Sequence, residues 1–185
     1  MSTQTTNTEQ PSQSAPKPGP RGGGRSFLKR LILVSLIAVA GLFTMSLTST
    51  QPTNLGIQPN GQLAVCPDSP NCVSTQATDA EHLIPAINLD SVEQPTLDTI
   101  KQLISTEFPR ARLVSESAEY LHYEFTSLIF RFVDDVEFLV DDENKRLHFR
   151  SASRVGYSDM GANRRRMEKI SQRLADQSSP QTPDE

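Results

Sequence analysis

Several features that mark common classes of protein are missing from this chain of 185 residues. It has no tryptophan, and aromatic residues make up only 6% of it, so we expect the few aromatic side chains to serve the core. The sequence has no Gly-x-Ser-x-Gly motif, no His-Glu-x-x-His pair and no glycine-rich phosphate loop. No motif therefore points to the common serine hydrolases, zinc proteases or nucleotide-binding enzymes.

Cysteine and histidine are also scarce, which limits metal and redox chemistry. Cys66 and Cys72 are the only cysteines, and the three histidines show no ligand spacing, so a zinc site would lack half of its ligands. The pair does not have the Cys-x-x-Cys spacing of thioredoxin-like proteins. We expect no metal and no cofactor.

Positive charge is scarce outside the N-terminal region. Residues 1–30 carry a formal charge of +4, whereas residues 31–185 carry 13 basic and 21 acidic side chains, a formal charge of −8. Nucleic-acid binding depends on clustered lysine and arginine side chains that displace counterions. We therefore do not expect nucleic acid as a partner.

One apolar segment is long enough to cross a membrane. Residues 31–48 carry no charge, and a helix of this length covers a hydrocarbon core of roughly 30 Å. Basic residues precede the segment and none follows it until Lys101, which by the positive-inside rule leaves the N-terminus in the cytoplasm and exports the rest. We favour a retained anchor, because the run is longer than a usual signal peptide core. Cleavage near the small residues 48–50 is the alternative.

Composition divides the rest of the chain. We expect a disordered cytoplasmic tail over residues 1–30, the anchor over 31–48, a polar linker over 49–65, an exported domain over 66–176 and a disordered tail over 177–185. Within the domain, residues 66–95 contain prolines and little periodicity. We expect them to form an extended, irregular arm.

The remaining periodicity predicts an α+β fold. Apolar residues at helical spacing predict a helix that Thr96 or Asp98 caps and Pro109 ends. Alternation with a period of two over residues 112–153 predicts about four antiparallel strands, the last two joined by a hairpin turn at residues 141–145. A second helix follows from about Met160. Its expected buried face consists of Met160, Asn163, Met167, Ile170 and Leu174.

The two cysteines lie just after the predicted linker, on the exported side of the membrane. Five residues separate Cys66 from Cys72, and such a loop accommodates a disulfide of ordinary geometry. Closing so short a loop stabilises the fold by about 2 kcal/mol or less. A metal or redox pair and two free thiols are the alternatives.

Four stretches together resemble a known family. They are LGIQPNGQLAVCPDSPNCVSTQA, EYLHYEFTSLIFRFVDDVEFLVD, LHFRSASRVGYSD and GANRRRMEKI. They resemble domain of unknown function 1499, which occurs in bacterial envelope proteins and in plastids, and the resemblance covers roughly residues 55–175. It implies a fold unit and an envelope setting. It implies no catalytic residues, because the family has no established activity.

Paired carboxylates form one candidate site. Asp134, Asp135 and Glu137 lie close together on a predicted strand, where carboxylates could serve acid–base chemistry. The predicted hairpin also sets Glu137 opposite Arg150, and such a cross-strand charge pair supports register by roughly 0.2–1 kcal/mol. We favour a solvated sheet face with paired charges. A functional polar face is the alternative.

The loop after the last predicted strand is the better candidate. Residues 150–159 leave the strand, turn at Gly156 and enter a helix, where arginines, hydroxyls and free N–H groups could bind an anion or carboxylate. The alternative is that Arg154 and Asp159 only brace the loop. Residues 164–166, all arginine, spread over three helix faces, so we expect mostly solvated or membrane-facing charge. The candidate ligand-binding residues are Arg150, Ser153, Arg154, Tyr157, Asn163, Asp134 and Asp135.

The sequence therefore favours a membrane-anchored envelope domain with a non-catalytic role. We expect it to bind a small anionic ligand, a lipid headgroup or a protein partner. The alternative is a hydrolase or transferase whose site combines Asp134, Asp135 and the loop of residues 150–157. An enzyme would need a carboxylate and Arg154 or Tyr157 to converge on one cleft.

Overall fold

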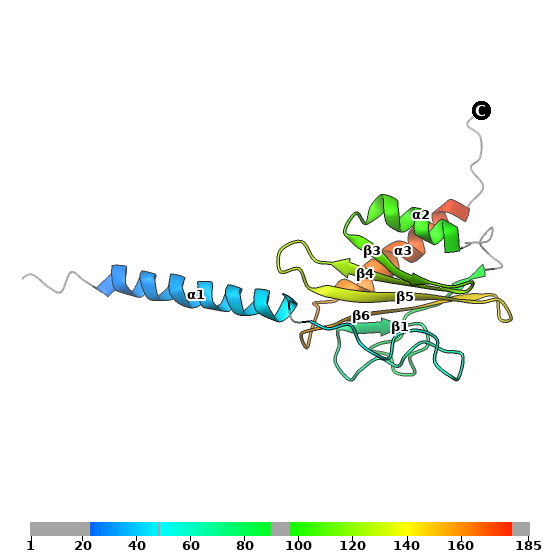
Figure 1. Cartoon of the computed structure of the whole chain (residues 1–185), viewed down its shortest axis with the longest axis horizontal. Helices are drawn as coiled ribbons and strands as arrows, with labels where there is room; N and C mark the ends of the chain where they lie inside the picture. The colour runs from blue at the N-terminus through cyan, green and yellow to red at the C-terminus, as the bar shows by residue number, and fades with distance from the viewer. Residues whose placement is uncertain (1–22, 48, 90–96, 179–185) are drawn as a thin grey trace, which may run out of the picture. The chain divides into compact units, whose positions relative to one another are not determined.

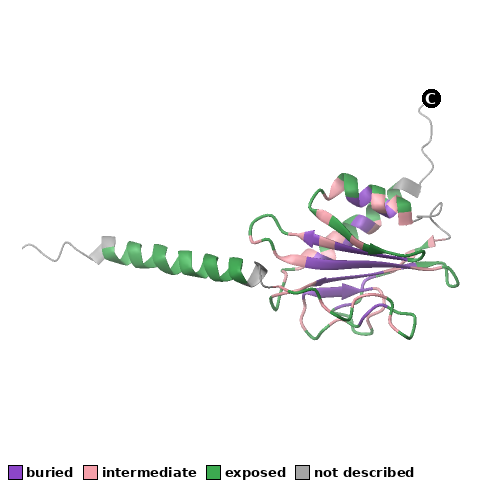
Figure 2. Cartoon of the chain, in the orientation of Figure 1, coloured by how far each residue is buried: buried purple, intermediate pink, exposed green. Residues whose placement is uncertain are grey.

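The computed structural model describes residues 23–47, 49–89 and 97–178, which form an N-terminal helix and a folded domain. The helix, α1 (Gly23–Leu47), contains the segment Ser26–Thr44, whose mean hydropathy of 2.0 and length suit a membrane anchor or a signal sequence. Its described side chains are exposed along the whole segment (Figure 2). Because α1 already begins at Gly23, the prediction of disorder is wrong for residues 23–30, and residues 1–22 lie outside the described part.

The domain is an antiparallel sheet with two helices on one face, which confirms the predicted α+β class (Figure 1). The strand order is β1-β6-β5-β4-β3, and β2 also pairs with β6, so the sheet has six strands where about four were expected. The strands are β1 (Cys72–Ser74), β2 (Ile87–Asn88), β3 (Ala111–Glu116), β4 (Tyr120–Thr126), β5 (Val133–Asp141) and β6 (Arg146–Ser153). The helices are α2 (Leu97–Glu107) and α3 (Ala162–Ser178).

The two extra strands correct the prediction of an irregular arm over residues 66–95. β1 pairs with β6 at residues 150–152, and β2 pairs with it at residues 146–147. With three and two residues, these strands are too short to show a period in the sequence. They complete the outer edge of β6. Residues 90–96, including the predicted cap Thr96, lie outside the described residues, and the other predicted cap, Asp98, lies within the first turn of α2.

The predicted hairpin between β5 and β6 is confirmed in register. Glu137 lies opposite Arg150, and Phe138 lies opposite Phe149. The Asp141 carboxylate accepts hydrogen bonds from the backbone N–H of Asn144 at 2.9 Å and from its side-chain amide at 2.8 Å, and Lys145 closes the turn with a positive φ of 51°. This register determines which side chains of β5 and β6 lie on each face of the sheet.

The face that packs against α2 and α3 carries the apolar core. Side chains at positions i, i+3 and i+4 of α2 meet alternate residues of β4, β5 and β6. Each fully buried side chain of this kind stabilises the fold by about 1.5–3 kcal/mol. The largest buried members are Ile100, Ile104, Leu121, Phe138, Leu147, Phe149, Met167, Ile170 and Leu174.

The start of α3 differs from the prediction. Met160 is 87% exposed, because α3 begins at Ala162 and Met160 lies in the preceding turn with a φ of +55°. The carboxylate of Asp159 caps the helix and accepts a hydrogen bond from the Asn163 N–H at 2.6 Å. The remaining predicted face, from Asn163 to Leu174, is buried as expected.

The other face of the sheet is covered by residues 49–66, which we call the cover segment. Leu63 packs against Tyr120 and Leu139, and the Gly56 N–H donates a 2.7 Å hydrogen bond to Glu137 Oε1. A disulfide between Cys66 and Cys72, with a Cα–Cα distance of 5.7 Å, fastens the end of the cover segment to β1. These contacts begin well before residue 66, where the domain was expected to start. The prediction that this sheet face is solvated is wrong.

Candidate functional site

Parts of three of the stretches that carry the family resemblance lie side by side in the sheet. Residues 66–74, 132–138 and 150–159 contribute to β1, β5 and β6, which are neighbours in the sheet. The Asn71 side chain donates a 2.6 Å hydrogen bond to the Gly156 carbonyl, and the Asn71 carbonyl accepts from Ser153 N–H at 3.0 Å. Polar side chains from these stretches form one cluster on each face of the sheet.

Glu137 is the centre of the cluster beneath the cover segment. Its side chain is fully buried, and it accepts hydrogen bonds from Tyr120 Oη at 2.8 Å and from Arg150 Nη1 at 3.2 Å, as well as from Gly56. A buried carboxylate is tolerated only when it is paired and hydrogen-bonded. Arg150 Nε is buried and has no hydrogen-bond partner among the described residues.

Asp135 forms a second ion pair on the same face. Arg154 donates to it through Nε at 2.8 Å and through Nη2 at 2.7 Å, and His122 Nε2 lies 2.8 Å from it. Arg154 also reaches Glu124 at 2.5 Å. The Asp135 side chain is 1% exposed and that of Arg154 is 7% exposed. Arg154 thus pairs with two carboxylates, and no described hydrogen bond joins it to Asp159.

Protonation in this cluster follows from its contacts. Burial alone raises the pKa of Asp135, but the hydrogen bonds and charges of Arg154 and His122 outweigh burial and bring that pKa below its usual value. At Glu124, burial likewise raises the pKa, but the hydrogen bonds and charges of Arg154 and Arg112 outweigh it, so that pKa is also lowered. Burial, followed by the charge of Glu137, raises the pKa of Tyr120 far above its usual value. None of these three groups is therefore poised to exchange a proton near neutral pH.

Asp134 lies on the opposite face, toward α3, because successive side chains of a strand alternate. It accepts a 2.6 Å hydrogen bond from Ser153 Oγ and pairs with Arg166. Asn163 donates to the Asn71 carbonyl at 2.9 Å and accepts from Arg166 Nη1 at 2.6 Å. The structure therefore brings Asp134, Ser153 and Asn163 together around Arg166, and it does not bring Asp134 and Asp135 to one site.

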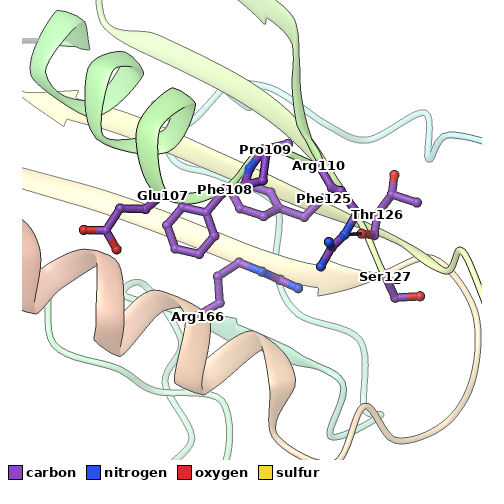
Figure 3. Close-up of a pocket in the computed structure, with 9 residues that line it drawn as sticks. Glu107, Phe108, Pro109, Arg110, Phe125, Thr126, Ser127 and Arg166 are labelled. Atoms are coloured by element: carbon purple, nitrogen blue, oxygen red, sulfur yellow. Dashed lines mark hydrogen bonds between the residues drawn. The ribbon is translucent and has the colours of Figure 1, made fainter. Parts of the chain in front are cut away.

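A surface pocket of about 190 Å³ lies beside Arg166 (Figure 3). Arg166 extends from α3 beneath the Phe125 ring, with its guanidinium carbon 4.8 Å from the ring centroid. Arg110, just before β3, donates from Nε to the Thr126 carbonyl at 3.2 Å. Glu107, Phe108, Pro109, Arg110, Ala111, Phe125, Thr126, Ser127 and Arg166 line the pocket. Two guanidinium groups from separate elements therefore border the same small space.

The remaining candidates lie elsewhere. Tyr157 is 75% exposed, and none of the described hydrogen bonds involves its side chain. Arg150 and Arg154 are buried against carboxylates on the covered face, so neither borders the pocket. The sequence did not indicate Arg110 or Ser127, and it indicated Arg166 only as part of a solvated run. That expectation is wrong for Arg166, whose side chain is 15% exposed.

Comparison with known proteins identifies the family of this chain. The model of a family described as a protein of unknown function (DUF1499) matches residues 62–174, which is more than half of the chain. The chain belongs to this family. No curated protein and no solved structure gives a significant match.

The contribution of Arg154 to stability can be tested with Arg112 as a matched control. Arg112 binds the other oxygen of Glu124 at 2.5 Å, but its side chain is 68% exposed. We expect Arg154→Gln to lower the free energy of unfolding by about 3–5 kcal/mol at neutral pH, because it leaves Asp135 buried without its cation. Arg112→Gln should cost about 1 kcal/mol or less, as exposed pairs do. Denaturant unfolding of the full chain in detergent, followed by circular dichroism, measures both.

The pH dependence of this difference has a defined sign. In the wild type, the lowered pKa of Asp135 contributes stability above its usual value of 3.8, and that stability is lost as the pH falls through the folded-state value. In Arg154→Gln, burial raises the Asp135 pKa instead, so the variant gains stability relative to the wild type on acidification. The gap between the two proteins should narrow below about pH 5. A gap that is constant with pH would contradict the assigned ion pair.

Proposed function

We propose that this chain is a membrane-anchored, exported binding module that holds a small anionic group, a phosphate or a carboxylate, in the pocket beside Arg166. The observation that carries the proposal is that Arg110 and Arg166 border one pocket together with Thr126 and Ser127. Guanidinium groups recognise phosphate and carboxylate through paired N–H donors, and hydroxyl groups complete the coordination of such ligands.

The local charge supports an anionic ligand. The positive charge of Arg166 is neutralised by its ion pair with Asp134. The negative charge of Glu107 is paired with two cations, Lys169 at 2.8 Å and Arg173 at 2.8 Å. Arg110 has no carboxylate partner among the described residues. These four basic and two acidic side chains, the pocket residues and their ion-pair partners, together carry a formal charge of +2. Residues 31–185 as a whole carry −8. An anion would therefore find favourable electrostatics at this pocket.

The pocket suits binding better than catalysis. Its only carboxylate, Glu107, has a pKa that the hydrogen bond from Lys169 holds below its usual value, so it stays ionised and paired. The volume of about 190 Å³ is smaller than the sites of drug-sized ligands and admits a single small group. Asp134, Ser153 and Asn163 act in this proposal as positioning residues that fix the Arg166 side chain.

Titration of the full chain in detergent with inorganic phosphate and with acetate tests the pocket. We expect one of these anions to raise the melting temperature of the wild type and of Arg112→Gln, an exposed arginine outside the pocket. Arg110→Gln should lose the response without a change in the melting temperature of the free protein, because Arg110 is exposed. An equal response in Arg110→Gln would refute the pocket as the site.

The compartment is part of the proposal. A disulfide is typical of oxidising, exported compartments, and basic residues precede α1 while none follows it until Lys101. We propose that the N-terminus is cytoplasmic, that α1 is retained as an anchor and that the domain is periplasmic or otherwise exported. A reporter that works only outside the cytoplasm should be active when fused after Glu185. Activity of a cytoplasm-only reporter at the same position would reverse this topology.

A further inference from the structure

Two loops expose apolar side chains to an unusual extent. Outside α1, five large apolar side chains among the described residues are at least 70% exposed. One is Val65, and the other four lie in residues 127–132 and 154–161, which we call the tip loops. These four are Leu128 at 70%, Ile129 at 74%, Tyr157 at 75% and Met160 at 87%. Folded domains rarely leave such residues gathered on one region without a partner.

The tip loops share one end of the sheet (Figure 1). The first connects β4 to β5 beyond the pair Thr126–Val133, and the second leaves β6 beyond the pair Asp134–Ser153. The Arg154 N–H, where the second loop begins, donates a 3.1 Å hydrogen bond to the Val133 carbonyl. The four exposed apolar side chains therefore belong to a single end of the domain.

The two ends of the sheet differ in charge. Apart from the buried Arg154, one arginine lies within the tip loops and two lie beside them, and the one acidic residue within the loops, Asp159, caps α3. The opposite end, formed by the β3–β4 and β5–β6 connections, has an excess of acid. The arginines are Arg110, Arg131 and Arg165, and the opposite end carries Glu116, Glu119, Asp141, Asp142 and Glu143 against Lys101, Lys145 and Arg146. The tip loops thus contain more arginine than acid, whereas the opposite end of the sheet has an excess of acid.

The chain keeps this domain close to a bilayer. α1 ends at Leu47, and the Gly56 N–H is already hydrogen-bonded to Glu137 of the sheet. Even if it were fully extended, the chain between them would span only about 30 Å. The domain is therefore held near the membrane surface, where a weak affinity of one face is amplified by high local concentration.

We propose that the tip loops insert into the interface of a bilayer that carries anionic lipid, with Leu128 and Ile129 in the acyl boundary and the flanking arginines among the headgroups. Leucine, isoleucine and methionine gain from leaving water, tyrosine suits the headgroup level, and arginine is attracted to acidic headgroups. The proposal depends on the exposure of the loops, on their charge and on retention of α1 as an anchor. It does not depend on what occupies the pocket beside Arg166.

The absence of tryptophan allows a direct test, because one introduced tryptophan reports without background. Ile129→Trp places a reporter in the first tip loop, Leu128→Trp provides a second in case the first misfolds, and Val65→Trp is the matched control at 85% exposure outside the tip loops. Each full-length variant is reconstituted into vesicles of phosphatidylcholine, with or without phosphatidylglycerol. A melting curve confirms folding, and brominated acyl chains serve as the quencher.

We expect bromine quenching and a blue shift for Ile129→Trp and Leu128→Trp in vesicles with phosphatidylglycerol, and neither change for Val65→Trp. Adding Arg165→Gln, which does not alter a residue that lines the pocket, should reduce the dependence on anionic lipid. A blue shift without bromine quenching would mean that another protein copy covers the loops, and it would overturn the proposal. Equal access of an aqueous quencher to Ile129→Trp and Val65→Trp would overturn it as well.

Discussion

The structure depends on a pair of buried carboxylates, Asp135 and Glu137, that lie side by side on one face of the central strand. A buried carboxylate is destabilising unless it is paired with cations and hydrogen-bond donors of its own. Arg154 supplies the donors for Asp135, and Arg150, Tyr120 and the Gly56 N–H supply those for Glu137. These donors come from β4, β6, the loop after β6 and the cover segment. Pairing the two carboxylates therefore joins four parts of the chain.

This requirement explains why both faces of the sheet are buried in so small a domain. The helix face is closed by apolar packing, whereas the other face is closed by the cover segment and the charges beneath it. The disulfide fastens the cover segment to β1, which is itself held by β6. The same arrangement fixes the loop after β6, because Arg154 at its start is tied to Asp135. The charge network thus serves the pocket and the tip loops indirectly, by fixing the end of the sheet on which they lie.

Much of this fold could be predicted from the sequence where a period or a local rule was present. The register of Glu137 with Arg150 followed from the hairpin, and the buried faces of α2 and α3 followed from helical spacing. The cover segment could not be predicted, because its contacts depend on isolated residues such as Gly56 and Leu63. The alternation on β4 and β5 is the same for a solvated polar face and for a buried charged one. Only the partners distinguish the two.

The sequence pattern could bring together only those candidate residues that lie on neighbouring elements. Of the seven candidate residues, Asp134, Ser153 and Asn163 lie together, because they come from neighbouring strands and the following helix. Alternation along β5 separates Asp135 from them, which the doublet of aspartates in the sequence conceals. Arg110 and Arg166 meet only because α2 and α3 pack on the same face, so no sequence motif joins them. A pocket assembled from three elements leaves no local pattern in the chain.

Hydrogen exchange at the Gly56 amide tests the central claim most directly. If the cover segment is held by the buried carboxylate, this amide should exchange in the native full-length protein far more slowly than an unstructured backbone, with protection close to that of the amides of β5. Substituting Glu137→Gln should reduce that protection, because a neutral amide is a weaker acceptor than a carboxylate. Exchange of Gly56 at the rate of an unstructured chain, while β5 remains protected, would contradict the account.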